Sequence, residues 1–180
     1  MVARTHHRSS PGGAEDSRRL IFIQMAKPDT FTQISIHAVF AVARRENVIA
    51  APWRDRLHQY ISGILASETE YALAVGGWKD HVHIFFELKA SQCVADVLKV
   101  VKSKSSGWVN ENNFVRGQFN WQAGYGAFAH SRPQRDDVIQ YITHQEEHHR
   151  QKTFREEYVQ MLDRHGISFN EAFLFEFYDS

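Results

Sequence analysis

The sequence contains a single cysteine, Cys93, so no disulfide can form within the chain. The disulfide-dense folds of small secreted proteins are therefore excluded, and the composition is typical of a reducing compartment. Cys93 also has no second cysteine at the short spacing that metal-binding and redox motifs require. We expect it to be a buried residue of a helix.

Long hydrophobic runs are absent as well. A helix that spans a bilayer needs about 20 consecutive apolar residues, and no stretch of the chain approaches that length. The apolar residues 20–23 form too short a run for the core of a signal peptide. We therefore expect no membrane association and a cytoplasmic protein.

The chain also lacks an excess of either charge. Its 21 Lys and Arg residues balance 21 Asp and Glu residues, and the pI is about 7.2. Proteins dedicated to duplex DNA are often more basic than this. A nucleic-acid site would have to be a local patch rather than a property of the whole surface.

The length and hydrophobic content of the chain are typical of a globular protein. A length of 180 residues with 43% hydrophobic residues predicts one domain with a full core. Residues 1–28 carry Ser, Pro and Gly without sustained periodicity and are predicted to be a disordered tail. Met25 precedes the first clear pattern and is an alternative start. Residues 29–180 are expected to form the single domain.

Alternation of apolar and polar residues predicts four strands, at 34–42, 71–75, 81–88 and 125–129. In the second strand Tyr71, Leu73 and Val75 are expected to share one face, and Gly76-Gly77 is the expected hairpin turn.

Helical spacing follows four residues that suit helix starts, namely Pro52, Ser91, Ser131 and Thr153. The third helix is expected to reach about His149 and the fourth to end near Gly166, while residues 109–124 are mostly loop. The order βαββαβ followed by helices predicts an α+β fold. It is a ferredoxin-like split βαβ arrangement with a central antiparallel sheet and additional C-terminal helices.

Two histidines of the third strand, His81 and His83, are the first candidates for chemistry. The period of two puts both rings on one face, while Val82 and Ile84 face the core. A shared divalent metal ion would remove the repulsion between two protonated rings. With 11 histidines, however, about 0.7 such pairs are expected by chance, so a pair of solvated strand histidines is an open alternative.

Tyr141 and Gln145 are four residues apart and therefore share a helix face. An amide oxygen suits Mg²⁺ or Mn²⁺, and a tyrosine one turn earlier would lie near the ion. Packing at the rim of the core is the alternative for Tyr141. His144 and His148 form a rival pair, but a zinc metalloprotease needs glutamate directly after the first histidine, where this chain has Gln145.

Further fragments accompany these two, and their order matters more than any one of them. They are Ile36-His37-Ala38-Val39-Phe40, Asp80-His81-Val82-His83-Ile84, Leu98-Lys99, Lys104-Ser105-Ser106, the stretch 121–128, Tyr141-Ile142 with Gln145, Glu147-His148-His149-Arg150, Glu157-Tyr158 and the stretch 162–167. Over about residues 31–175 the chain resembles the HUH-type single-tyrosine transposases, which include the REP-associated tyrosine transposases. Ala129-His130 and Gly77-Trp78-Lys79 depart from the pattern of that family.

The resemblance implies that His81, His83 and Gln145 hold Mg²⁺ or Mn²⁺ and that Tyr141 is the nucleophile. It implies an enzyme that cleaves single-stranded DNA, often beside a hairpin, and rejoins it through a 5′-phosphotyrosine intermediate. A homodimer is expected, with a monomer as the alternative. The protein is expected to associate with the bacterial nucleoid. A catalytically silent DNA-binding protein and a nuclease without a covalent intermediate are the competing functions.

Basic and aromatic residues are the candidates for DNA contact, because cations pair with phosphates and aromatic rings stack on bases. We predict contacts from Lys99, Lys102, Lys104, Arg116, Trp108, His148, His149 and Arg150. For Trp121 and Tyr125, base stacking and burial are equally weighted alternatives.

Overall fold

The computed structural model describes residues 31–44 and 48–177, so the predicted tail and the alternative start at Met25 lie outside the described residues. The elements are β1 (Ser35–Ala41), α1 (Ala51–Glu68), β2 (Tyr71–Gly77), β3 (His81–Glu87), α2 (Val94–Glu111), β4 (Gly126–His130), α3 (Arg135–Thr143), α4 (Gln145–His148) and α5 (Phe154–Arg164). Two short 3-10 helices, η2 (Arg132–Gln134) and η3 (Glu171–Phe173), precede α3 and follow α5.

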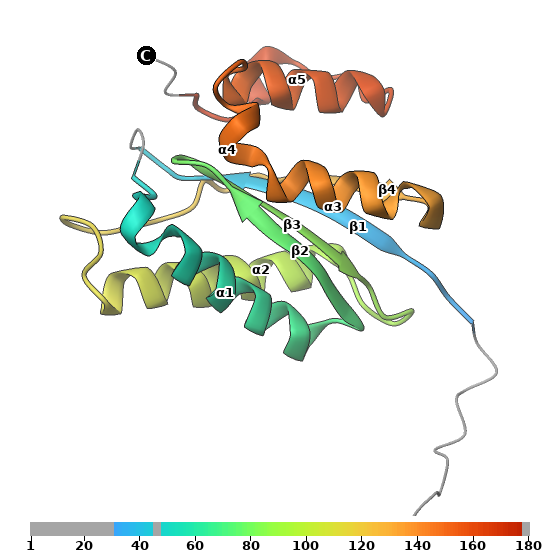
Figure 1. The fold of residues 1–180 in the computed structure, drawn as a ribbon, viewed down its shortest axis with the longest axis horizontal. Coiled ribbons are helices and arrows are strands. Elements are labelled where there is room, and N and C mark those ends of the chain that lie inside the picture. Colours follow the sequence, from blue (N-terminus) through green and yellow to red (C-terminus); the bar gives the residue numbers. More distant parts are fainter. Residues whose placement is uncertain (1–30, 45–47, 178–180) are drawn as a thin grey trace, which may run out of the picture. The chain divides into compact units, whose positions relative to one another are not determined.

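The strands form one antiparallel sheet in the order β2-β3-β1-β4 (Figure 1). This is the strand order of a βαββαβ split arrangement, so the predicted α+β fold is confirmed. The central strands β1 and β3 are buried along their whole length. Ala41 pairs with His81, so the end of β1 lies beside the beginning of β3.

Helices α1 and α2 cover one face of the sheet (Figure 1). Alternate residues of the central strands, such as Phe40 and Ile84, point into this layer and meet Leu57 of α1 and Leu98 of α2. Burying each such side chain stabilises the fold by about 1.5–3 kcal/mol. The predicted period of two in the strands and of 3.6 in the helices is therefore what builds this core.

Helices α3, α4 and α5 lie over the opposite face (Figure 1). Val138 and Ile142 of α3 pack on Phe85. Leu162 of α5 belongs to a second cluster with Phe128. Since β3 points His81 and His83 to this face, the three helices close over the histidine pair.

Strand β2 differs from the prediction. Its pairing with β3 shifts between Ala72 and Ala74, and such a bulge reverses the alternation of side chains. Val75 therefore packs with the α1 and α2 layer, whereas Leu73 packs on the α3 side, so the prediction that they share a face is wrong. The expected turn residues Gly76-Gly77 are the last two residues of the strand.

Helix α2 begins later and ends later than predicted. The side chain of Gln92 accepts a hydrogen bond from the Lys89 backbone N–H and donates to the Glu68 carbonyl, which fixes a turn before the helix. The residue before the first helical position is therefore Cys93 rather than Ser91. Cys93 is exposed, so the prediction that it is buried is wrong.

The helix predicted from Ser131 to about His149 is interrupted. His144 has φ −106° and ψ 26°, which separates α3 from the single turn α4. The Thr143 hydroxyl and the His144 ring both bond the Gln140 carbonyl, at 3.1 and 2.7 Å. Side-chain bonds of this kind compete with the helical backbone pattern. Tyr141 and Gln145 therefore belong to two different elements.

Helix α5 begins as predicted, with a capping box. The Thr153 hydroxyl accepts the Glu156 backbone N–H at 3.2 Å, and the Glu156 carboxylate accepts the Thr153 N–H at 2.9 Å. The helix ends at Arg164, two residues before Gly166, whose φ of +63° suits glycine. Within the described residues, no helix has the length and apolar character needed to cross a membrane.

Candidate active site

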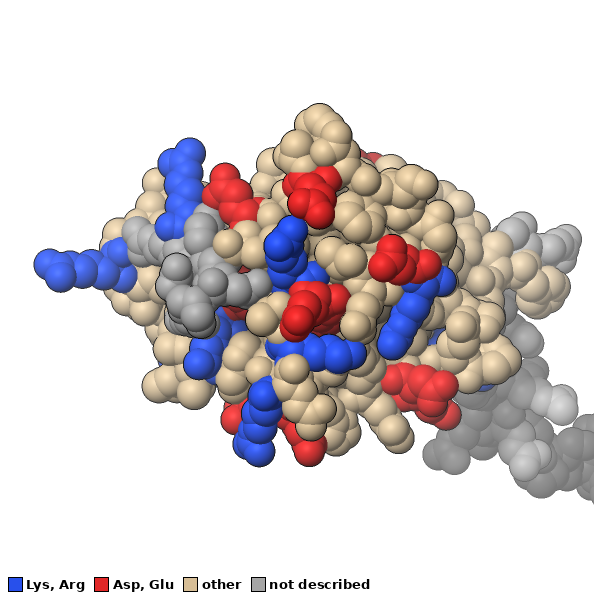
Figure 2. Space-filling view, turned by 90° about the horizontal axis from the view of Figure 1, so that it is seen from above, with Lys and Arg blue, Asp and Glu red and all other residues tan. Residues whose placement is uncertain are grey.

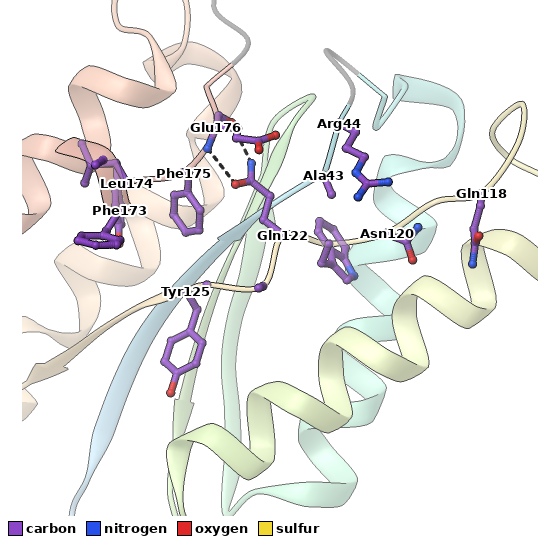
Figure 3. A pocket seen from close by; sticks show the side chains of 15 residues that line it. Ala43, Arg44, Gln118, Asn120, Gln122, Tyr125, Phe173, Leu174, Phe175 and Glu176 are labelled. Atoms are coloured by element: carbon purple, nitrogen blue, oxygen red, sulfur yellow. Dashed lines mark hydrogen bonds between the residues drawn. The ribbon is translucent and has the colours of Figure 1, made fainter. Parts of the chain in front are cut away.

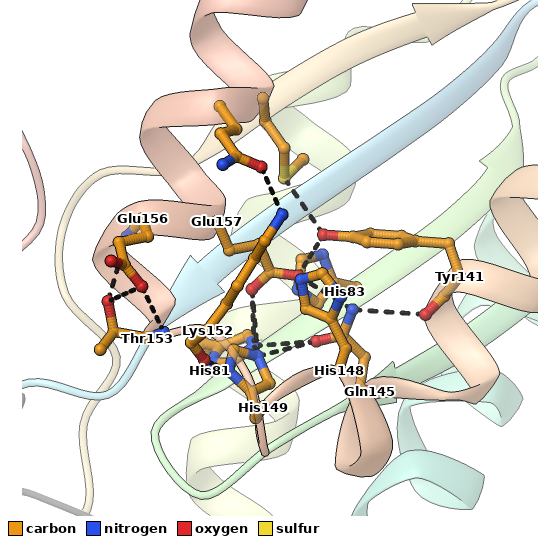
Figure 4. Close-up of polar contacts among 12 residues, drawn as sticks. His81, His83, Tyr141, Gln145, His148, His149, Lys152, Thr153, Glu156 and Glu157 are labelled. Carbon is orange, nitrogen blue, oxygen red and sulfur yellow. Dashed lines mark hydrogen bonds and ion pairs between the residues drawn. The ribbon is translucent and has the colours of Figure 1, made fainter.

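The rings of His81 and His83 are completely buried under α4 and α5 (Figure 4). The alternative that they are a pair of solvated strand histidines is therefore wrong. Their ring centroids lie 4.9 Å apart and nearly perpendicular. The ring of His81 also stacks on Phe154, the first residue of α5, at 4.0 Å. The first turn of α5 thus lies directly against the histidine pair.

Each ring is held through its Nδ1 atom. Nδ1 of His81 lies 2.7 Å from a carboxylate oxygen of Asp80. Nδ1 of His83 lies 3.0 Å from Nε2 of His37 on β1. The Nε2 atoms of both rings face the space between the sheet and α5, since they lie 3.6 and 3.5 Å from the Glu157 carboxylate.

Glu157 of α5 fills that space. Its carboxylate oxygens lie 3.6 Å from Nε2 of His81 and 3.5 Å from Nε2 of His83. Gln145 of α4 donates to the same carboxylate at 3.0 Å, and its amide oxygen lies 3.3 Å from Nε2 of His81. The side chains of Gln145 and Glu157 are both nearly fully buried.

His149 adds a third imidazole to this cluster. Its Nδ1 lies 3.0 Å from the carbonyl of Lys152, to which it donates, so its Nε2 points toward the histidine pair. That Nε2 lies 3.1 Å from Nε2 of His81, 3.0 Å from the Gln145 amide oxygen and 3.1 Å from the Glu157 carboxylate. His81, His83, Gln145, His149 and Glu157 therefore form one buried donor cluster, and a bound cation would reduce the repulsion between their lone pairs.

A divalent metal ion fits this donor set. The ligand atoms of His81, His83 and Glu157 all lie within 4.8 Å of one another. Nε2 of His83 and one carboxylate oxygen of Glu157 are buried without a hydrogen-bond partner among the described residues, and a metal ion satisfies such atoms. Imidazole and carboxylate together suit a transition ion such as Mn²⁺. The buried His-His-Glu group could hold such an ion, with Gln145 and His149 beside it.

Tyr141 of α3 lies at the edge of this cluster. Its hydroxyl donates to the carboxylate of Glu157. Its ring packs edge-on against His83, with centroids 5.7 Å apart. A shallow pocket of about 260 Å³ opens beside Tyr141 and is lined by His144, Glu147 and His148. The Tyr141 ring packs at the rim of the core, as the alternative predicted. Its hydroxyl, however, points into the cluster.

The pKa values in the cluster respond to burial and to the close charges. Burial would lower the pKa of His81, but the hydrogen bond with Asp80 and the charge of Glu157 outweigh it and raise the pKa. Burial opposes ionisation of Glu157, yet the charge of His83 and a hydrogen bond from His149 hold its pKa well below the ordinary value. Burial and the charge of Glu157 raise the pKa of the Tyr141 phenol. Glu157 is therefore ionised and Tyr141 protonated.

The residues predicted to contact DNA are not brought together. Lys99, Lys104 and Trp108 lie on α2, across the sheet from the histidine pair. Lys104 pairs with Glu68 at 2.8 Å, and Trp108 stacks on Tyr60.

Lys102 donates to the carbonyls of Gln122, Ala123 and Gly124, so its ammonium group holds that loop in place. Arg116 and Arg150 are exposed, on the loop after α2 and at the end of α4. His149 is in the donor cluster, with 4% of its side chain exposed, and His148 borders it, 3.6 Å from Glu157.

The face above α3 and α5 carries interspersed charges of both signs rather than a basic patch (Figure 2). A separate groove of about 1020 Å³ lies where β1 ends, at the same end of the sheet as His81 (Figure 3). Asn120 and Tyr125 line one part of it, and the segment that contains Phe173 lines another. Tyr125 is 38% exposed there, whereas Trp121 is buried and donates its ring N–H to Ser105 at 2.9 Å. For Trp121, burial is the correct alternative.

Sequence reasoning missed Glu157. It lies in Arg155-Glu156-Glu157, which has the appearance of a charged first turn of a helix. Two signals could have found it: Glu157-Tyr158 is one of the fragments that resemble the family, and Phe154 and Glu157 lie three residues apart, on a helix face that packs on the sheet.

Comparison with known proteins agrees with the fold. The family model described as "Transposase IS200 like" matches residues 30–145. The crystal structure of a candidate transposase from Deinococcus radiodurans R1 is similar, with a TM-score of 0.53 and 19% identity over 66% of this chain and 95% of that chain. A REP-associated tyrosine transposase bound to a REP hairpin has a TM-score of 0.49 and 10% identity, over 68% of this chain and 73% of that chain. No curated protein matches the chain.

Proposed function

The chain belongs to the IS200-like transposase family and is a DNA transposase, and we propose that it cleaves and rejoins single-stranded DNA through Tyr141. The observation that carries this proposal is the position of the Tyr141 hydroxyl, which reaches the carboxylate at the centre of the donor cluster. Attack of that oxygen on a phosphodiester forms a 5′-phosphotyrosine bond and frees a 3′-hydroxyl. The same bond energy is then available for rejoining, so no ATP is required.

Other residues of the site orient the nucleophile and the histidines and exclude water. Glu157 holds the Tyr141 hydroxyl, and a phenol hydrogen-bonded to a carboxylate keeps a fixed orientation toward the site. Asp80 orients His81 through its Nδ1. The layer formed by α4 and α5 excludes water from the histidine rings, which are fully buried. These contacts prepare the attacking oxygen for an in-line approach to phosphorus.

A divalent ion, when bound, supplies a Lewis acid that polarises a phosphoryl oxygen. We propose that His81, His83 and Glu157 hold it, with Gln145 as a further oxygen donor, and that the ion is Mn²⁺ or Mg²⁺. This set differs from the predicted one, because Glu157 adds a carboxylate to the two histidines and Gln145.

We further propose that the DNA strand lies in the groove beside β1. Amide side chains such as Asn120 can bond base edges, and an exposed Tyr125 ring offers a stacking surface. Hairpin DNA is the proposed substrate, with the nucleoid as the proposed location. One chain supplies Tyr141, both histidines and Glu157, which supports a site composed of a single chain. A homodimer stays a prediction.

The test is adduct formation on a denaturing gel, with single-stranded hairpin DNA and Mn²⁺. Tyr141→Phe should abolish the covalent protein–DNA band while DNA binding persists. The matched control is Tyr60→Phe, because Tyr60 packs on Trp108 across the sheet from the site. Tyr60→Phe should form the adduct as the unaltered protein does.

Each other outcome selects a competing function. Nicked DNA without a covalent band, in the unaltered protein, would identify a nuclease. A mobility shift without nicking would identify a catalytically silent binding protein. A full-rate adduct from Tyr141→Phe would remove Tyr141 from the mechanism.

A further inference from the structure

The two buried histidines of β3 are supported by different partners. Asp80, which supports His81, is the adjacent residue on the same strand. His37, which supports His83, comes from β1 and is itself only 3% exposed. The His37 and His83 nitrogens lie 3.0 Å apart, so one of them donates a proton to the other.

The direction of that hydrogen bond decides what His83 can do. A neutral imidazole carries one proton, on either Nδ1 or Nε2. If the proton is on Nε2 of His83, the lone pair points at His37 and no electron pair faces Glu157. If His37 accepts, the proton is on Nδ1 of His83, and the lone pair of Nε2 faces the donor cluster.

We propose that His37 is a positioning residue that accepts the Nδ1 proton of His83 and so fixes the tautomer that presents Nε2 to the metal ion. The inference rests on the metal site of the proposed function and adds a residue to it. Partners of this kind orient metal-binding histidines in many proteins. Nε2 of His83 is buried and has no hydrogen-bond partner among the described residues, so it is the atom that this arrangement leaves available.

A role in packing alone is the competing explanation. The His37 ring also lies 6.3 Å from Phe128 and 6.0 Å from Tyr141, measured between centroids. A leucine would preserve most of that packing and remove the acceptor. A glutamine would preserve an acceptor oxygen at a similar reach.

The experiment measures Mn²⁺ binding by calorimetry in the full chain, without DNA. His37→Leu should weaken binding by about 10- to 100-fold, and His37→Gln should recover most of that loss. The matched control is His130→Leu, since the His130 ring lies 5.8 Å from His37 and its nitrogens have no hydrogen-bond partner among the described residues. Equal affinity in His37→Leu and His130→Leu would overturn the inference.

A second measurement does not depend on the folding of any His37 variant. Long-range ¹H–¹⁵N correlation spectra of the metal-free protein report which nitrogen of each histidine carries the proton. The His83 signals, assigned by their loss in His83→Gln, should show the proton on Nδ1. A proton on Nε2 would overturn the inference.

The two readouts separate this inference from the proposed function. Neither measurement contains DNA, so a failure of adduct formation leaves both results unchanged. If the unaltered protein bound no Mn²⁺, the proposed metal site would be wrong, and the spectra would still decide the role of His37.

Discussion

The carboxylate of Glu157 contacts four imidazoles, an amide and a phenol. An anion in the middle of nitrogen donors serves two purposes. In the proposed mechanism, it brings negative charge to the place where the metal ion would bind, and it holds the Tyr141 hydroxyl at that place. On this proposal, the single side chain of Glu157 couples the metal ion to the tyrosine.

Replacing Glu157 with Gln removes the charge and keeps the shape. We expect Mn²⁺ affinity to fall by about 100-fold or more, because a carboxylate ligand is lost from the ion. Calorimetric titration checks this. Glu156→Gln is the matched control, since Glu156 is exposed and glutamine also completes a capping box. Equal losses in the two variants would contradict the role of Glu157.

His58 of α1 gives a pH dependence of the folding stability. Burial lowers its pKa from 6.5 to about 4. Between pH 6.5 and pH 4 the unfolded chain binds a proton that the folded chain does not, so stability falls as the pH falls through this window. At pH 5 the loss due to His58 is about 2 kcal/mol relative to pH 7.5.

His58→Leu should therefore lose less stability than the unaltered protein between pH 7.5 and pH 5, by about 2 kcal/mol. Urea unfolding at the two pH values measures the difference. An identical pH dependence in both proteins would show that the folded state binds the proton as readily as the unfolded one.

Some residues of the site could be predicted from the sequence and others could not. His81 and His83 were predictable, because a strand of known period fixes which side chains share a face. Glu157 was not, because its carboxylate reaches the site only through the angle at which α5 crosses the sheet. The sequence distance from His83 to Glu157 carries no information about that angle.

At the scale of helices and strands, a prediction from the sequence is correct when the interactions that form the element lie close together in the chain. Thr153 and Glu156 interact within one helical turn, and the helix start that they predict is confirmed. The bulge between Ala72 and Ala74 depends on pairing with β3, and periodicity did not reveal it. The break at His144 arises from competition between side-chain and backbone bonds, which apolar spacing does not record.

Gly76, near the end of β2, permits the close approach of α3. A Cβ atom at this position would collide with the backbone carbonyl of Ile142, which cannot move without moving Tyr141. We expect Gly76→Ala to lower the free energy of unfolding by about 1–3 kcal/mol and to weaken Mn²⁺ binding. Denaturant unfolding and calorimetry measure the two effects.

Gly63→Ala is the control for that substitution. Gly63 lies within α1, and a Cβ atom there meets no other atom within 4 Å. Alanine should stabilise this helix by about 0.5–1 kcal/mol. If both alanine substitutions changed the free energy of unfolding in the same direction, the proposed role of Gly76 would be contradicted.

At the scale of the whole molecule, charge and shape lead to different expectations about DNA. Net charge is zero, and the α3 and α5 face is mixed in sign (Figure 2). Long-range attraction to DNA is therefore expected to be weak, and in our proposal recognition depends on the groove beside β1. The predicted basic residues of α2 lie behind the sheet, because helix α2 follows β3 into the other layer.

Tyr125→Ala should weaken binding of single-stranded DNA by about 1–3 kcal/mol, the contribution of one stacked base. Fluorescence anisotropy with a labelled strand measures it. Tyr71→Ala is the matched control, because Tyr71 is also exposed but lies at the end of the sheet away from His81. If the two variants bind DNA equally well, the strand does not cross the groove at Tyr125.

The location of Glu157 on the last long helix has a consequence for the timing of synthesis. A ribosome makes the histidine strand first and the carboxylate more than seventy residues later, as counted from His83 to Glu157. Until α5 has left the ribosome, the nascent chain has Tyr141 and both histidines but no carboxylate between them. If the proposed metal site is correct, a copy truncated before Glu157 is expected to bind the ion weakly and to leave DNA uncut.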